Sequence, residues 1–274
     1  MSRIAAAFTR QAAPGKALIA YVMAGDPSLA QTEEIVLTLA RAGADLIELG
    51  VPFSDPVADG PTIQGAAERA LKQGTSLAAI LRMVATLRAR TQVPLVLMTY
   101  CNPVYAFGVA SFFAVARAAG VDGVIVPDLP LEEAGSFLAQ RPRHPVDIIF
   151  LVTPTTPRER IEKIVKASSG FVYYVSLTGI TGAPLADRRA VMERLRQMKG
   201  MTALPVAVGF GIATPEEARE VAEVADGVIV GSALVKIIAS AATDPTALAR
   251  LAAFTRALKD ALRAPHGVSS PQRC

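Results

Sequence analysis

Short apolar runs alternate with longer segments of helical pattern from one end of the chain to the other. Most of the runs are continuously apolar, as in parallel strands that are covered on both faces. They predict eight strands, at residues 17–24, 45–51, 94–100, 123–127, 147–152, 171–176, 205–210 and 227–230. Helices are predicted at residues 28–42, 77–90, 110–119, 131–140, 157–167, 186–198, 215–225 and 248–262.

The even alternation of strands and helices predicts a single (β/α)8 barrel of the TIM type. An open doubly wound sheet is the alternative, but no Gly-x-Gly-x-x-Gly motif follows the first strand. We also expect an extra N-terminal helix, and a short helix at 233–239 after the eighth strand. The barrel domain is expected to span residues 1–264, followed by a small, polar and mobile tail at 265–274.

Composition narrows the class of protein. The chain has 274 residues, of which 51% are hydrophobic and 19% charged, which argues against general disorder. Neither a membrane span nor a secretory signal is expected from the lengths of its apolar stretches. The only cysteines are Cys101 and Cys274, which excludes a disulfide framework and indicates the cytoplasm. The net charge of +4 comes without basic patches interleaved with aromatic residues, so no nucleic-acid partner is expected.

A carboxylate interrupts the apolar second strand. Alternation places Leu46, Glu48 and Gly50 on one face of that strand. If this face lines the barrel interior, burial should raise the pKa of Glu48, which suits a group that gives and takes a proton near neutral pH. The alternative is a carboxylate that only accepts hydrogen bonds from backbone groups in a turn.

The segment that follows this strand is rich in Pro, Gly and Asp, and it is longer than a usual connection in a barrel. It carries Asp55 and Asp59. Each could form a turn or cap a helix. One carboxylate on a strand and another on a loop would also make a workable acid–base pair, which makes Asp59 a catalytic candidate.

Glycines gather after the last three strands, where barrels often bind a substrate phosphate. They lie at 179–182, at 209–211 and at Gly231, which precedes Ser232 at the start of the short helix. Backbone N–H groups at glycines and at a helix N-terminus can bind an anion. Tyr100 and Tyr173 end or lie within strands and could grip a flat apolar ligand, although ordinary barrel filling would also explain them.

Other kinds of site are disfavoured. The two histidines, His144 and His266, lie outside these segments, so a Ser-His-Asp triad is not expected. Lys236 lies in the helix after the eighth strand rather than at a strand end, which disfavours a Schiff-base lysine. No carboxylate cluster has the spacing of a metal site. The residues therefore indicate acid–base chemistry on a phosphorylated substrate with an apolar portion, without a cofactor.

At these positions the sequence resembles the tryptophan synthase alpha chain family. The stretch LIELGVPFSDPVADGPTIQ at 46–64 is similar to that family's signature almost throughout. Further matching stretches are GDP at 25–27, LMTYCNP at 97–103, VPDLP at 126–130, GITG at 179–182, GFGI at 209–212 and Gly231-Ser232. The resemblance covers about residues 3–262 and implies a single barrel.

The resemblance implies the retro-aldol cleavage of indole-3-glycerol phosphate to indole and D-glyceraldehyde 3-phosphate in tryptophan biosynthesis. It makes Glu48 the general acid–base, which protonates the indole ring at C3 and deprotonates the side-chain hydroxyl. It makes Asp59 the partner of the indole N–H. The substrate-binding positions that it implies are Tyr21, Tyr100, Tyr173, Thr181, Gly182, Phe210, Gly211, Gly231 and Ser232.

The resemblance also implies a partner, a pyridoxal-phosphate-dependent beta chain in an α2β2 complex, whereas this chain would hold no cofactor. Residues 52–59 and 102–108 would face the partner, with Phe53, Pro103, Val104 and Tyr105 as exposed apolar residues. Alternatively, these residues pack on their own barrel. The rival functions are a stand-alone indole-releasing lyase, a sugar-phosphate isomerase, and a non-catalytic phosphate-binding subunit that activates a partner enzyme.

Overall fold

The computed structural model describes residues 2–10, 16–175, 188–209, 211–242 and 244–263. All strand pairs among these residues are parallel, in the order β5-β4-β3-β2-β1-β9-β8-β7-β6. The strands are β1 (Ala17–Met23), β2 (Leu46–Gly50), β3 (Leu95–Met98), β4 (Gly123–Ile125), β5 (Asp147–Ile149), β6 (Leu151–Val152), β7 (Val172–Val175), β8 (Val206–Gly209) and β9 (Gly227–Val230).

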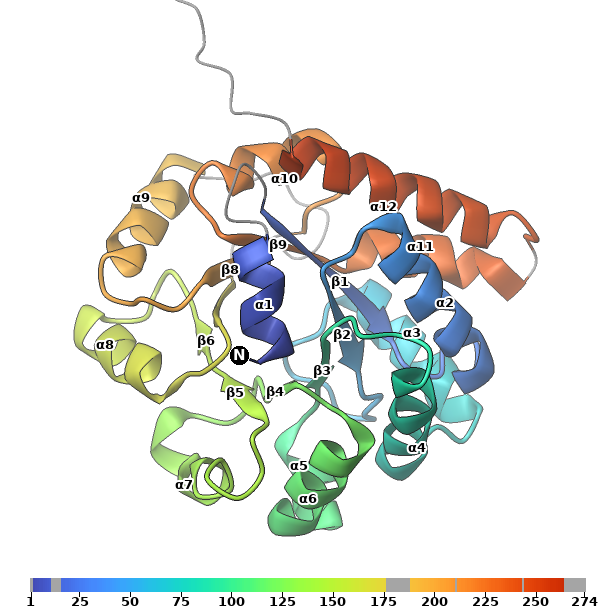
Figure 1. Ribbon diagram of the computed structural model, residues 1–274, viewed down its shortest axis with the longest axis horizontal. Coiled ribbons are helices and arrows are strands. Elements are labelled where there is room, and N and C mark those ends of the chain that lie inside the picture. Colours follow the sequence, from blue (N-terminus) through green and yellow to red (C-terminus); the bar gives the residue numbers. More distant parts are fainter. Residues whose placement is uncertain (1, 11–15, 176–187, 210, 243, 264–274) are drawn as a thin grey trace, which may run out of the picture.

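The sheet closes on itself through one interrupted strand. β5 pairs with β4, β6 pairs with β7, and only Phe150 separates β5 from β6. The two segments together form the fifth predicted strand, so each of the eight predicted runs lies in the barrel (Figure 1). The prediction of a (β/α)8 barrel is confirmed, and the open sheet is excluded.

Helices surround the barrel (Figure 1). They are α1 (Arg3–Arg10), α2 (Leu29–Ala42), α3 (Pro61–Lys72), α4 (Leu77–Arg88), α5 (Cys101–Phe107), α6 (Val109–Ala119), α7 (Gly135–Leu138), α8 (Arg158–Ala167), α9 (Arg188–Lys199), α10 (Pro215–Ala222), α11 (Ser232–Ala239) and α12 (Ala247–Arg263). Short 3-10 turns, η1 (Leu131–Glu133) and η2 (Ser240–Ala242), precede α7 and follow α11. None of the helices among the described residues is both long and apolar enough to span a membrane.

Two layers of apolar residues hold the barrel together. Alternate side chains of each strand point outward, as those of Ile47 and Leu49 do, and pack against the helices in the larger core cluster. The intervening side chains fill the interior, where Leu46 packs with Ile19 and Val96. This alternation matches the face assignment predicted for the second strand.

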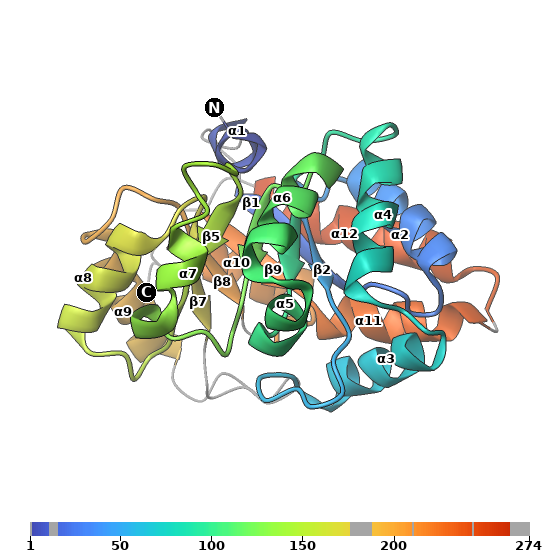
Figure 2. The same ribbon diagram turned by 90° about the horizontal axis from the view of Figure 1, so that it is seen from below.

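The expected extra N-terminal helix is α1, and it closes the barrel at the N-terminal end of the strands. Ile4 is fully buried in the interior cluster, and the ring of Phe8 lies 5.6 Å from that of Phe171. Arg3 fixes the helix through Asp122, with a distance of 2.9 Å between nitrogen and oxygen. Figure 2 shows α1 at one end of the barrel and the segment between β2 and α3 at the other. The expected short helix after the eighth strand is α11.

Two helices, α3 and α5, lie in segments where no helix was predicted. α3 begins at Pro61, inside the segment expected to be a long loop, because proline suits the first position of a helix. α5 occupies the segment 102–108, and the Asp128 carboxylate accepts a hydrogen bond from the Cys101 N–H at 2.9 Å. The predicted helix at 131–140 is only η1 followed by the single turn α7, where Gly135 weakens the helical pattern. The tail predicted at 265–274 lies outside the described residues.

Candidate active site

Glu48 lies at the centre of β2, and its side chain enters the barrel interior. In the strand register it stands between Tyr21 of β1 and Val96 of β3. Only 1% of the residue is exposed to solvent. Neither carboxylate oxygen accepts a hydrogen bond from the described residues. The alternative of a carboxylate that only satisfies backbone groups in a turn is therefore not what the structure shows.

The electrostatic surroundings of Glu48 favour its protonated form. Burial is the main cause and the charge of Asp59 adds to it, and together they raise the pKa of Glu48 from 4.5 to about 8. At neutral pH the group therefore holds a proton that it can donate. A carboxyl group with a pKa near the working pH is suited to general acid–base catalysis.

Asp59 reaches the same region from the segment between β2 and α3. The Gln64 side-chain amide donates a hydrogen bond to the Asp59 carbonyl oxygen at 2.7 Å. Tyr100 fixes the preceding residue, because the Ala58 N–H donates to its phenolic oxygen at 3.2 Å. Burial raises the pKa of Asp59, whereas a hydrogen bond from Tyr100 opposes that shift. The other aspartate of the segment, Asp55, is exposed and lies beside Ser54.

Two tyrosines flank the carboxylates inside the barrel. Burial, together with the charges of Glu48 and Asp59, raises the pKa of Tyr21 and of Tyr173 well above 10, so both phenols stay neutral. Tyr173 needs the glycine beside it in the sheet, because a Cβ at Gly209 would lie 2.7 Å from the phenolic oxygen. As side chains alternate along a strand, Tyr173 faces the interior and its neighbour Tyr174 faces outward.

An ion pair between a buried aspartate and a partly exposed arginine, which sequence reasoning did not single out, supports α3. Asp26, after β1, is 1% exposed and accepts two hydrogen bonds from the Arg69 guanidinium, each 2.8 Å long. The pair ties α3, which starts just after Asp59, to the carboxyl end of β1. The motif GDP at 25–27 could have drawn attention to Asp26, but nothing in the sequence indicated that Arg69 is its partner.

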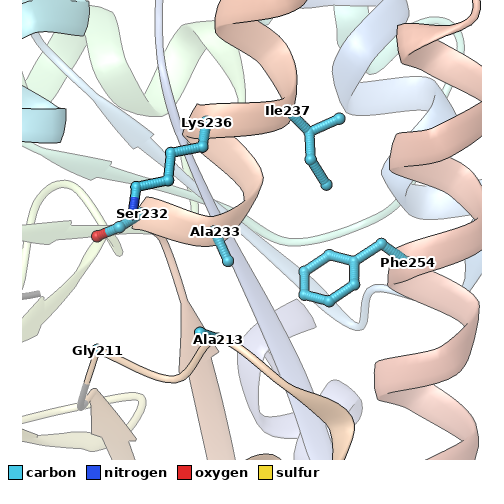
Figure 3. A pocket seen from close by; sticks show the side chains of 7 residues that line it. All are labelled: Gly211, Ala213, Ser232, Ala233, Lys236, Ile237 and Phe254. Atoms are coloured by element: carbon cyan, nitrogen blue, oxygen red, sulfur yellow. The ribbon is translucent and has the colours of Figure 1, made fainter. Parts of the chain in front are cut away.

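The rim after β8 and β9 forms a pocket of about 290 Å³ (Figure 3). Gly231 precedes α11, and Ser232 is the first residue of that helix. The Ser232 hydroxyl oxygen is buried and has no hydrogen-bond partner among the described residues. The lining residues are Gly211, Ala213, Ser232, Ala233, Lys236, Ile237 and Phe254. A free hydroxyl at a helix N-terminus beside glycine backbone suits an anionic group.

Three of the expected substrate-binding residues, Thr181, Gly182 and Phe210, lie outside the described residues. The structure brings Glu48, Tyr21, Tyr100 and Tyr173 together with the segment of Asp59, and it places Gly211, Gly231 and Ser232 at the rim. The described part of the chain holds no group of three His, Cys, Asp or Glu side chains that could bind a metal ion.

The surface expected to face a partner is only partly apolar and exposed. Val57 is 80% exposed and Tyr105 is 48% exposed. Val104, however, is fully buried, so the prediction that it is exposed is wrong. Its position in α5 directs the side chain towards the core of the barrel itself. Phe53 is half-buried and packs against Tyr100, with 5.3 Å between the ring centroids. The alternative that these residues pack on their own barrel therefore holds for Val104 and in part for Phe53.

Comparison with known proteins identifies the family of the chain. A family model described as the tryptophan synthase alpha chain matches residues 8–263. The tryptophan synthase alpha chain of Geotalea uraniireducens is 50% identical over 97% of this chain and all of that protein. The structure of the alpha subunit from Legionella pneumophila has a TM-score of 0.88 at 40% identity, covering 96% of this chain and 98% of that one. The Mycobacterium tuberculosis tryptophan synthase structure has a TM-score of 0.88 at 39% identity, covering 96% and 99%. The chain therefore belongs to the tryptophan synthase alpha chain family.

Proposed function

We propose that Glu48 and Asp59 perform the reaction of this family in the present chain. By its family the chain is an indole-3-glycerol phosphate lyase of tryptophan biosynthesis. The observation that carries the assignment is the state of Glu48, a buried carboxyl group without hydrogen-bond partners among the described residues and with a pKa of about 8. Burying such a group lowers the stability of the fold, and carboxyl groups with strongly shifted pKa values are typical of functional sites, which favours a catalytic role.

The reaction begins with the protonated form of Glu48. The carboxyl group gives its proton to C3 of the indole ring, and the ring becomes a positively charged iminium that can accept electrons. The resulting carboxylate then takes the proton of the side-chain hydroxyl next to C3. A carbonyl forms, the carbon–carbon bond breaks, and its electron pair restores the neutral indole. Glu48 ends protonated, so the acid–base group is regenerated in each cycle.

Asp59 has the complementary task in this scheme. While C3 is protonated, the indole nitrogen carries positive charge, and a carboxylate that accepts a hydrogen bond from its N–H stabilises that charge. The hydrogen bond from Tyr100 favours the ionised form of Asp59, although burial works against it. The two carboxyl groups thus sit in environments that suit different roles, an acid at Glu48 and a charge-stabilising base at Asp59.

The remaining substrate contacts follow from the same placement. Tyr21, Tyr100 and Tyr173 supply a neutral aromatic surface for the indole ring. Gly231 and Ser232 offer backbone N–H groups and a free hydroxyl to the phosphate. We assign the same binding role to Gly211 on the pocket wall, and to Thr181, Gly182 and Phe210.

The family uses no cofactor in this chain, and pyridoxal phosphate belongs to the beta chain. The matched Mycobacterium tuberculosis structure is of tryptophan synthase, which supports a beta-chain partner. We assign the contact to the exposed apolar side chains of Val57 and Tyr105, from the segment 52–59 and from α5, in an α2β2 complex. A cytoplasmic location agrees with the buried free thiol of Cys101.

Release of glyceraldehyde 3-phosphate from indole-3-glycerol phosphate tests the assignment directly. The wild type, Glu48→Gln, Asp59→Asn and the control Asp55→Asn are assayed with and without a beta chain. We expect Glu48→Gln to lose at least about 100-fold in kcat, the usual contribution of one general acid–base group. A loss of similar size, about 100-fold, is expected for Asp59→Asn, because it removes a charge that stabilises the transition state. Asp55→Asn should keep wild-type turnover in the assay without the beta chain, since its carboxylate is exposed.

The outcomes separate the rival functions. Slow turnover alone that rises strongly with the beta chain supports the complex. Fast turnover that is the same with and without the beta chain indicates a stand-alone lyase. Wild-type turnover in Glu48→Gln refutes the catalytic assignment and leaves a phosphate-binding subunit as the better description.

A further inference from the structure

The pocket after β8 and β9 contains a positive charge that the proposed reaction does not yet use. Of the seven residues that line it, only Lys236 carries a charge. Ala213, Ile237 and Phe254 make the rest of the wall apolar. Lys236 is therefore the lining residue that can attract an anion through a full positive charge.

Lys236 stands over Ser232 on one face of α11. The two residues are four positions apart in the helix, so their side chains lie on the same side, one turn apart. Figure 3 shows the Lys236 ammonium group pointing back along the helix towards Ser232. The Lys236 side chain thus extends towards the end of the helix that carries the Ser232 hydroxyl, which is buried and has no hydrogen-bond partner among the described residues.

Two other lysines have clear ion-pair partners among the described residues, and Lys236 has none there. Lys199 binds Asp226 and Lys259 binds Asp45, with 2.6 Å between nitrogen and oxygen in each pair. No ion pair joins Lys236 to a carboxylate in the described part of the chain, and its side chain is exposed. The ammonium is thus free to turn to an arriving ligand.

We propose that Lys236 is a further phosphate-binding residue, whose ammonium group gives the site its preference for a dianion. This inference rests on the proposed function, since it concerns the phosphate of the same substrate. Backbone N–H groups and a hydroxyl present only partial positive charge to a phosphate. A phosphate ester carries nearly two negative charges at pH 7, because its second pKa is about 6. Lysine adds a full charge on a flexible stem that can follow the ligand.

Binding of glycerol 3-phosphate, the phosphate-bearing half of the substrate, tests the inference without any turnover. Calorimetric titrations compare the wild type with Lys236→Met, Lys236→Arg and Lys166→Met. Lys166 is the matched control, an exposed lysine in the last turn of α8 that lines no part of this pocket. Removing a charge-assisted contact should weaken Kd about tenfold in Lys236→Met, whereas the Arg variant and the Lys166 variant should stay within about twofold of wild type.

Two further measurements distinguish a lysine that contacts the phosphate from one that only stabilises the structure. Wild-type affinity should rise between pH 5 and pH 8 as the ligand loses its second proton near about pH 6, and Lys236→Met should show a smaller rise. Affinity should also depend less on salt in that variant, because one ion contact has gone. In turnover, the loss should fall mainly on KM rather than on kcat.

Equal affinity, pH response and salt response in Lys236→Met and wild type overturns the inference. Absence of glycerol 3-phosphate binding to the wild type overturns it together with the proposed phosphate site. Loss of affinity in Lys236→Met combined with unimpaired turnover in Glu48→Gln refutes the proposed chemistry and still supports Lys236 as an anion-binding residue.

Discussion

Replacing Glu48 by glutamine should stabilise the protein while it removes activity. The pKa of this carboxyl group is about 8 in the folded chain and 4.5 as the reference for an unfolded one. Below about pH 4.5 the group is protonated in both states, so its ionisation does not change the free energy of unfolding. Between these values the unfolded chain releases the proton and the folded chain keeps it, so the wild type loses stability as pH rises through this window.

The structure sets the size of this effect. A difference from 4.5 to about 8 corresponds to about 5 kcal/mol at full ionisation. About two thirds of that, roughly 3 kcal/mol, should already be felt at pH 7. Glutamine has no charge to lose, so Glu48→Gln avoids the penalty. Its stability advantage over wild type should therefore grow from near zero at about pH 4.5 to several kcal/mol at about pH 9.

Urea denaturation of the whole chain at several pH values measures the difference directly. The exposed aspartate Asp55 provides the control, because Asp55→Asn should differ from wild type by a nearly constant amount across the range. A constant stability difference between Glu48→Gln and wild type from acid to alkaline pH would refute the reasoning. It would mean that water or a polar group satisfies the carboxylate, and that its burial does not favour the protonated form.

Three further predictions concern the same end of the barrel. Under conditions where chemistry limits the rate, kcat should fall as pH rises through about 8, because the first step needs protonated Glu48. A flat profile of indole release across that pH would contradict it. Gly209→Ala should lose about 1–3 kcal/mol and raise KM, since the new Cβ meets the Tyr173 oxygen at 2.7 Å. Gly135→Ala, with no atom within 4 Å of its new Cβ, serves as control in the same denaturation assay, and equal stabilities would speak against the clash. Arg69→Met should cost about 1–3 kcal/mol and lower turnover, because it leaves the buried carboxylate that Arg69 pairs with unsatisfied and releases α3. Unchanged denaturation midpoint and kcat would show that the pair does not position α3.

The barrel was predictable from sequence because both faces of its strands are buried. This turns strands such as β1 and β9 into continuous apolar runs that stand out from the helices. α5 was not predictable in the same way, because the carboxylate at its N-terminus comes from Asp128, 27 residues further along the chain. The break in the fifth strand at Phe150 carries no local signal either, since the residues on both sides are apolar.

The catalytic candidate Glu48 was visible as a charge within an apolar strand, and its alternation gave the correct face. Its partner Asp59 was harder to recognise, because a loop aspartate beside glycine is more often a turn residue. Its role rests on contacts with Gln64 and Tyr100 that only the folded chain brings together. The sequence also did not identify Lys236 as a phosphate-binding candidate. Its position in a helix does not show which pocket the ammonium group reaches.

The helix that closes the N-terminal end of the barrel has a kinetic consequence. With Ile4 of α1 buried in the apolar interior, the described residues block the N-terminal end of the barrel and leave the carboxyl ends of the strands for access to the site. Substrate and both products must therefore use the same opening, one after the other. Glyceraldehyde 3-phosphate that has not yet left holds the phosphate position that the next substrate molecule needs, so inhibition by this product should be competitive with indole-3-glycerol phosphate.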